Sequence, residues 1–198
     1  MLKNHANRKR SRIFGPVASN LNNRTNRVIH RPVDDWEAKE ETEMGTEAAA
    51  QDRPKWLEER RKGIGGSDSP VILGVSPFKT PLDLWQEKRG EGKDEPPTPA
   101  MQRGTHLENL IAQIYSERTG RKLRRSRQIL RHKDHDWMIA NIDRHIVAEN
   151  GSGPGILEIK CPGLSVFAKC RREGLPDYYT VQLQHYLEVR GWAWGSFA

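Results

Sequence analysis

Apolar side chains are distributed very unevenly along this chain of 198 residues, and this limits which part of it can fold. Short apolar runs such as Val71-Ile72-Leu73 and Ile156-Leu157 recur after Trp56, whereas they are nearly absent before Arg53. A segment without such runs cannot bury enough surface to offset the entropy lost on ordering. We therefore expect residues 1–53 to form a flexible extension and residues 54–198 to form one folded domain.

The net charge of the chain indicates which classes of partner it can bind. Residues 1–33 are basic and residues 34–47 acidic; over the whole chain 33 Lys and Arg exceed 26 Asp and Glu, a net charge of +7. Such a surplus favours a polyanion, either nucleic acid or an anionic membrane surface. The sequence has no apolar stretch long enough to span a bilayer and no signal-peptide core, so we expect a soluble cytoplasmic protein with no membrane partner.

The pattern of apolar residues predicts a mixed α/β domain in which helices come first, strands follow, and helices return. The clearest helix contains Leu107, Leu110, Ile111, Ile114 and Tyr115 at three- and four-residue spacing and ends at Gly120. Ser67 or Asp68 is expected to cap a short helix that begins after the glycine-rich turn at 63–66. The other predicted helices cover 56–61, 82–90, 164–172 and 177–190, and the predicted strands cover 122–130, 137–148, 156–160 and 192–197.

Two acidic residues fall on neighbouring predicted strands. In the strand 156–160, side chains alternate, so Leu157 and Ile159 should face a core while Glu158 and Lys160 face away from it. In the preceding strand, Asp143 should likewise lie opposite the face shared by Ala140 and Ile142. The turn at 150–153 folds the two strands together and brings both acids to one outward side, where a divalent cation would relieve their repulsion.

Glu108 supplies a third carboxylate, since on its helix it borders the buried stripe. Hard oxygen ligands of this kind suit Mg²⁺, with Mn²⁺ as a substitute. Each motif also has a plainer explanation: a surface ion pair for Glu158 and Lys160, and an ordinary helix-face glutamate for Glu108. The two cysteines, Cys161 and Cys170, are too few for a four-cysteine zinc or iron–sulfur site.

An Asp followed by Glu-x-Lys on the next strand resembles the PD-(D/E)xK nucleases, although Ile142 stands where that pattern has proline. The likeness extends along the domain, and over residues 56–198 the chain resembles the YqaJ-like viral recombinase family, which groups with phage lambda exonuclease. The motifs that carry it are Gly63-Ile64-Gly65-Gly66-Ser67-Asp68, Ile72-Leu73-Gly74, Ser76-Pro77-Phe78, Arg103-Gly104 ahead of Glu108, Leu157-Glu158-Ile159-Lys160-Cys161-Pro162, and Gln182-Leu183-Gln184.

The resemblance implies a PD-(D/E)xK fold, a small mixed sheet flanked by helices, and a role for each matched residue. Asp143, Glu158, the carbonyl of Ile159 and Glu108 would hold the metal. Lys160 would contact the attacking water and the scissile phosphate, and Gln182, with Gln184 as the alternative, would orient it. Arg61 and Ser67 would bind the 5′-phosphate of DNA; the plainer interpretation of that turn is a capped helix.

The implied activity is metal-dependent degradation of double-stranded DNA from its ends, in the 5′-to-3′ direction, during phage or prophage recombination. The resemblance also implies a single-strand annealing partner and a ring-shaped homo-oligomer. Two alternatives stay open: an endonuclease of the same fold, and a non-catalytic or degenerate DNA-binding module. The family continues past the position of Ala198, so we expect a C-terminally truncated or degenerate copy.

Overall fold

Local signals at the helix ends explain where two of the central helices begin and end in the computed structural model, which describes residues 53–92, 96–126, 128–149 and 151–198. Helix α4 (Pro81–Lys88) begins at a capping box in which the Thr80 hydroxyl accepts from Asp83 N–H and the Asp83 carboxylate accepts from Thr80 N–H. Helix α5 (Pro99–Thr119) is capped by Thr98 and ends at Gly120, whose φ of 70° favours glycine.

The order of elements confirms the predicted alternation of helices and strands. All described residues belong to one compact unit, Met44–Ala198, and nearly all of the predicted extension lies outside the described residues. None of the helices described is long and apolar enough to cross a membrane. The remaining helices are α2 (Arg53–Arg61), α3 (Ser69–Ile72), α6 (Leu164–Glu173) and α7 (Asp177–Arg190), and the strands are β1 (Leu123–Arg125), β2 (Leu130–Arg131), β3 (Ile139–Ala140), β4 (Arg144–Ile146), β5 (Gly155–Glu158) and β6 (Gly195–Phe197).

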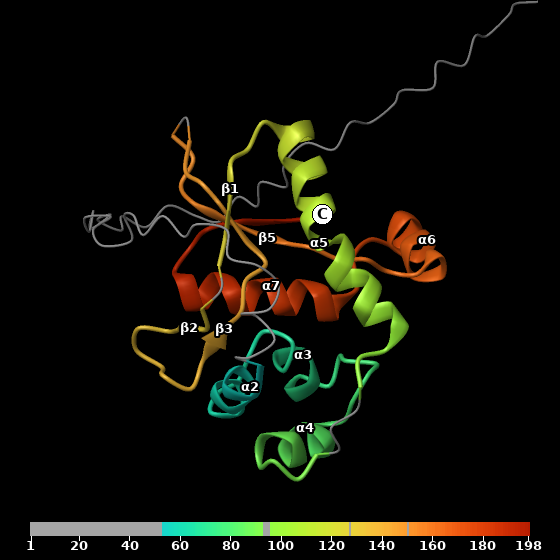
Figure 1. Cartoon of the computed structure of the whole chain (residues 1–198), viewed down its shortest axis with the longest axis vertical. Coiled ribbons are helices and arrows are strands. Elements are labelled where there is room, and N and C mark those ends of the chain that lie inside the picture. Colours follow the sequence, from blue (N-terminus) through green and yellow to red (C-terminus); the bar gives the residue numbers. More distant parts are fainter. Residues whose placement is uncertain (1–52, 93–95, 127, 150) are drawn as a thin grey trace, which may run out of the picture. The chain divides into compact units, whose positions relative to one another are not determined.

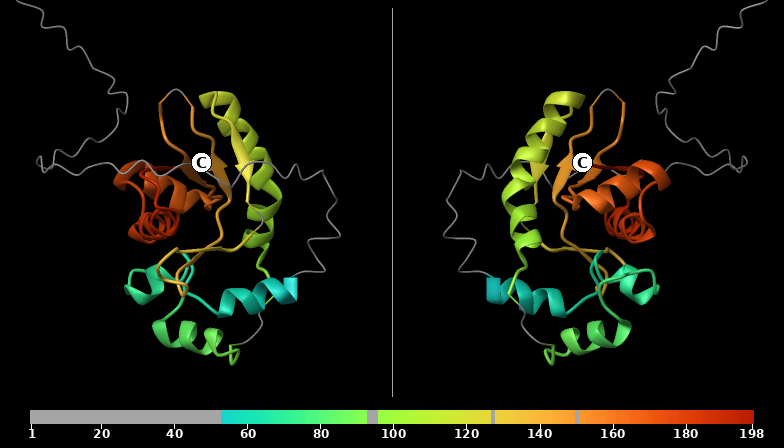
Figure 2. Two further views of the ribbon diagram at one scale, coloured as in Figure 1. Left: turned by 90° about the vertical axis from the view of Figure 1, so that its left-hand side faces the viewer. Right: turned by 90° about the vertical axis from the view of Figure 1, so that its right-hand side faces the viewer.

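A four-stranded mixed sheet forms the centre of the described domain. Its order is β1-β4-β5-β6; β4 is antiparallel to β1 and β5, and β6 runs parallel to β5. Helix α5 covers one face of this sheet, and α6 and α7 lie on the other side (Figure 2). Strands β2 and β3 form a separate antiparallel pair next to one end of α7 (Figure 1). The predicted class, a small mixed sheet flanked by helices, is confirmed.

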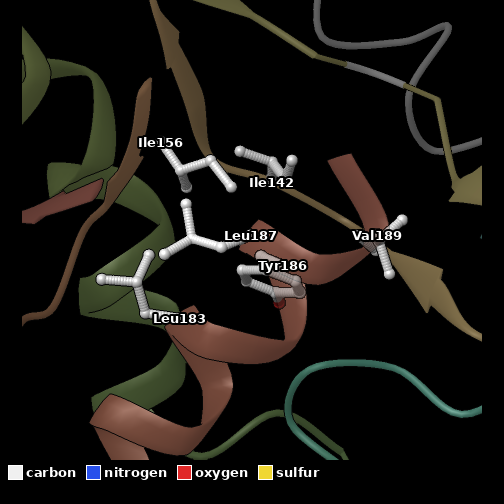
Figure 3. Close-up of a cluster of buried hydrophobic side chains, with 7 residues drawn as sticks. Ile142, Ile156, Leu183, Tyr186, Leu187 and Val189 are labelled. Carbon is white, nitrogen blue, oxygen red and sulfur yellow. The ribbon is translucent and has the colours of Figure 1, made fainter. Parts of the chain in front are cut away.

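The main apolar core lies between the strands and α7. Figure 3 shows Ile142 and Ile156 facing Leu183, Tyr186 and Leu187 of the helix. These residues recur on α7 at the three- and four-residue spacing that places side chains on one face. Fully burying a side chain of this size contributes roughly 1.5–3 kcal/mol, so this contact fixes α7 against the sheet.

Two predicted strands are each broken in two, so their prediction as continuous strands is wrong. The segment predicted at 122–130 forms β1 and β2, and the segment at 137–148 forms β3 and β4. The break between β3 and β4 contains Asp143, whose Oδ2 accepts from Ile159 N–H at 2.8 Å. A side chain thus takes the place of a backbone partner at the break, while β3 pairs with β2 and β4 joins the larger sheet.

The prediction that Glu158 faces outward is also wrong. Strand side chains do alternate, and Glu158 shares its side of β5 with Ile156, which belongs to the core against α7. Because helices cover both faces of the sheet, this side is not open to solvent, and Glu158 is only 3% exposed. Asp143 is half-buried. Glu158 therefore lies inside the protein, and Asp143 lies at the border between the interior and the surface.

Candidate active site

The end of strand β5, the residues just after it and helix α7 bring together the three polar side chains at the centre of the site. Lys160 Nζ donates to Glu158 Oε1 at 2.7 Å and to Gln182 Oε1 at 2.8 Å. Gln182 Nε2 donates to the same Glu158 oxygen at 2.8 Å and to the Tyr186 hydroxyl at 3.0 Å. Because Gln182 and Tyr186 are one helical turn apart on α7, the packing of that helix sets the position of the whole cluster.

Asp143 reaches the same cluster from the break between β3 and β4. Burial raises the pKa of its carboxyl, the hydrogen bond from Ile159 N–H opposes this rise, and the charge of Glu108 adds to it. Lys160 and Arg144 lower the pKa of Asp143 by their positive charges. The carboxylate of Asp143 therefore lies within electrostatic reach of both Glu108 and Lys160.

Among the carboxyl groups of the site, that of Glu158 has the most strongly shifted pKa. Burial raises the pKa of Glu158 to about 7, the charges of Asp143 and Glu108 add to the rise, and Lys160 opposes it. Its Oε1 accepts two hydrogen bonds, whereas the buried Oε2 has no partner among the described residues. A buried acceptor without a partner is costly, so this oxygen is available to a ligand that carries positive charge.

Glu108 lies near the two acids but is held by an arginine. Arg144 is 6% exposed, and its guanidinium donates to Glu108 Oε1 at 2.5 Å, to Asn109 Oδ1 at 2.6 Å and to the Asp143 carbonyl at 2.6 Å. These bonds tie α5 to β4 beside Asp143. Among the residues that the structure describes, no three His, Cys, Asp or Glu side chains are already arranged to hold a metal ion.

The remaining predicted residues of this site lie as follows. Ile159 contacts Asp143 through its N–H, while the prediction concerned its carbonyl. Gln182 is in contact with Lys160 and Glu158, and Gln184, two positions later on α7, is exposed. The structure therefore brings Asp143, Glu158, Lys160 and Gln182 into one cluster, with Glu108 at its edge.

The glycine-rich turn brings two cations to one buried acid. Asp68, 1% exposed, occupies the N-cap position of α3, but its side chain does not cap the helix. Its Oδ2 instead accepts from Gly65 N–H at 2.8 Å and pairs with Lys88 at 2.6 Å, and its Oδ1 lies 3.8 Å from Arg60. Arg60 also donates to the Ser67 hydroxyl at 2.7 Å. Arg60, which contacts Ser67, directly precedes Arg61, the arginine that the resemblance assigned to the 5′-phosphate.

Several of these residues could not be chosen from the sequence. Arg144 follows Asp143 inside an apolar stretch, and a charged residue there was the only signal that it needs buried partners. Its partners on α5 lie 35 and 36 positions earlier in the chain. Nothing in the sequence indicated that Lys88 pairs with a buried acid, since it looks like an ordinary basic residue in the last turn of α4.

The chain is similar in sequence to a protein of Bacillus subtilis. The chain is 43% identical over 140 residues to the uncharacterized protein YqaJ of Bacillus subtilis (strain 168), covering 70% of this chain but 43% of that protein. The chain therefore spans less than half the length of that relative.

Two crystal structures also match. One is LHK-Exo in complex with dAMP, with a TM-score of 0.60, and the other is LHK-Exo described as an alkaline exonuclease from Laribacter hongkongensis, with a TM-score of 0.58. Each is 22% identical to this chain, and each match covers 73% of this chain and 72% of that one. The likeness identifies the fold as that of the PD-(D/E)xK nucleases. Residues 55–193 match the family described as the YqaJ-like viral recombinase domain, and the chain belongs to that family.

Proposed function

We propose that this chain is a metal-dependent nuclease that hydrolyses phosphodiester bonds of double-stranded DNA from its ends. One observation carries the proposal: the buried Glu158, with its partnerless Oε2, lies in a cluster with Asp143 and Lys160. A buried acid with a raised pKa beside a second acid and a lysine is typical of a functional site. The fold supports the same class of chemistry.

Mg²⁺, or Mn²⁺ in its place, is the cofactor that we propose. The residues fit it: Glu158 Oε2 has no partner, and the charges of Asp143 and Glu108 raise the pKa of Glu158. Asp143 and Glu158 would hold the ion, with the carbonyl of Ile159 and the carboxylate of Glu108 as further ligands. When bound, such an ion lowers the pKa of a water molecule and neutralises charge on the phosphate. Since Arg144 holds Glu108 in this structure, we assign Glu108 the least direct part.

The side chains themselves have distinct tasks in the proposed reaction. Lys160 would place its ammonium group against the scissile phosphate, where negative charge develops. Gln182 would hold that ammonium group in position, because its amide bonds both Lys160 and Glu158. Tyr186, through its hydroxyl contact with the amide of Gln182, would fix the orientation of the glutamine.

The second part of the proposed site is the turn around Ser67, which would bind the 5′-phosphate. Arg60 and Lys88 share the single carboxylate of Asp68, so the group carries a net positive charge next to the exposed Ser67. A phosphate could accept from the Ser67 hydroxyl and from Arg60. We assign this task to Arg60 and Ser67, and keep Arg61, which is exposed, as the neighbouring candidate.

Family membership suggests the wider setting. A viral recombinase domain would work in the cytoplasm of a bacterial or phage-infected cell, in phage or prophage recombination. The 5′-to-3′ direction, a single-strand annealing partner and a ring-shaped homo-oligomer belong to the same proposal, and no described contact bears on them.

The test is incubation of the protein with linear, 5′-phosphorylated duplex DNA and with closed circular DNA, each with Mg²⁺ and with EDTA. We expect the linear duplex to be degraded only with Mg²⁺ and the circle to survive. Degradation of the circle would favour an endonuclease. Glu158→Ala and Lys160→Ala should abolish cleavage, and Glu173→Ala, at an exposed residue of α6, is the control. Cleavage that survives the first two changes would refute the assignment.

A further inference from the structure

A row of aromatic rings leads from the lysine of the site to the protein surface. Lys160 Nζ lies 5.1 Å from the centre of the Tyr179 ring. Tyr179 lies edge-on to Tyr178 with ring centres 4.5 Å apart, and Tyr178 lies edge-on to Phe78 with centres 5.4 Å apart. Phe78 comes from the loop between α3 and α4, so this row joins that loop to α7.

Phe78 is the exposed end of the row. It is 76% exposed, although burying a phenylalanine side chain normally stabilises a folded protein. Its contact with Tyr178 uses little of the ring, so packing alone does not account for a large apolar residue at this position. The large open ring surface is instead suited to a flat partner.

The loop that carries Phe78 is held at both ends. Val75 N–H and Ser76 N–H both donate to the Pro70 carbonyl, at 2.9 and 3.0 Å. The Ser76 hydroxyl accepts from Phe78 N–H at 3.3 Å, and Thr80 begins the capping box of α4. The ring is therefore presented by a loop that already has its shape, which lowers the entropic cost of binding a partner.

We propose that Phe78 and Tyr178 form a stacking platform for unpaired bases of the DNA strand whose phosphate lies at Lys160. This inference rests on the proposed function, since that function places a DNA strand at the lysine. Aromatic side chains stack on bases of any sequence, while positive charge attracts the phosphates. The chain carries a net charge of +7, and Lys160 lies at the inner end of the row. The platform would hold the strand after its bases have left the duplex.

The experiment compares two 5′-phosphorylated single-stranded oligonucleotides of equal length, one with all its bases and one with abasic residues at its 5′-terminal positions. Binding to the full chain is measured by fluorescence anisotropy with EDTA present, so that neither strand is cut. The variants are Phe78→Ala, Phe78→Trp as the conservative replacement, and Trp137→Ala as the control. Trp137 is also an exposed aromatic residue at 52%, but its ring contacts His135.

Wild type, Phe78→Trp and Trp137→Ala should prefer the strand with bases by about 5- to 150-fold per stacked base, whereas Phe78→Ala should lose most of this preference. Equal weakening for both strands, or no change in Phe78→Ala, would overturn the platform. Because Phe78 is exposed, thermal unfolding should be nearly unchanged in its variants. Cleavage of linear duplex is assayed in parallel: its absence in wild type would refute the proposed nuclease, whereas the base preference alone decides on the platform.

Discussion

Replacing Glu158 with glutamine should separate the stability of the protein from its proposed activity. Burial and the nearby acids raise the pKa of Glu158 from 4.5 to about 7, so the folded protein holds a proton that the unfolded chain releases. A group of this kind favours the folded state fully below about pH 4.5, and this contribution is lost as the pH rises through about 7. The size of this rise in pKa corresponds to about 3 kcal/mol of unfolding free energy.

Glutamine has nearly the shape of glutamate, and its Oε1 can still accept from Lys160, but it carries no charge at any pH. We therefore expect the metal-free wild type to lose about 3 kcal/mol more stability between about pH 4.5 and pH 8 than Glu158→Gln loses. At about pH 8 the variant should be the more stable protein, although it should cleave no DNA. Stabilisation by removal of a functional charge is a known compromise at active sites.

The assay is urea unfolding followed by circular dichroism at several pH values, with EDTA present to exclude divalent ions. Taking the difference between wild type and variant at each pH removes the contribution of groups that both proteins share. Glu173→Gln is the control, because Glu173 is an exposed residue of α6. Parallel loss of stability in wild type and Glu158→Gln would refute the claim that the buried carboxyl binds a proton near neutral pH.

Three further changes test other parts of the account. Lys160→Met should lower the cleavage rate by about 10²- to 10³-fold, the typical cost of removing one group that stabilises transition-state charge; a rate within a few-fold of wild type would contradict this. Arg144→Met should lower the unfolding free energy by about 3 kcal/mol in urea, since it removes a buried partner of Glu108; a change near zero would show that these bonds do not hold α5. Gly66→Ala should lower the unfolding free energy by roughly 1–3 kcal/mol, because the added Cβ would lie 2.3 Å from the Tyr186 ring. A Cβ at Gly104 in α5 meets nothing within 4 Å, so Gly104→Ala, the control, should not lower the stability of the protein.

The convergence of Asp143 and Glu158 could be predicted because it depends on local rules. The sequence predicts a turn that sets two strands side by side, and β4 and β5 do pair, which brings Asp143, just before β4, next to the end of β5. The same rules could not show that α7 packs against β5. Burial of Glu158 depends on α7, whose Gln182 donates to Glu158 from more than twenty positions away in the sequence. For the same reason the raised pKa of Glu158 could not be predicted.

The surroundings of the site were the less predictable part. The break at Asp143 depends on its bond to Ile159 N–H, and a continuous pattern of apolar residues across 137–148 gave no sign of it. Arg144 and Lys88 acquire their importance only from partners brought near by the fold. The end of α5 at Gly120, in contrast, depends on neighbouring residues alone and lies where the sequence predicted it, and α4 begins one residue before the predicted position 82. The start of α5 at Thr98 was not predicted, because the apolar pattern of that helix begins only at Leu107.

The most direct test of the central claim is the binding of Mn²⁺ to the protein without DNA, measured from the electron paramagnetic resonance signal of free Mn²⁺. The account predicts that wild type removes Mn²⁺ from solution, that added Mg²⁺ competes with it, and that Asp143→Asn and Glu158→Gln each weaken the binding by at least about tenfold. The Glu173→Gln control should bind as wild type does. Equal binding by wild type and both site variants would contradict the claim that Asp143 and Glu158 hold the metal.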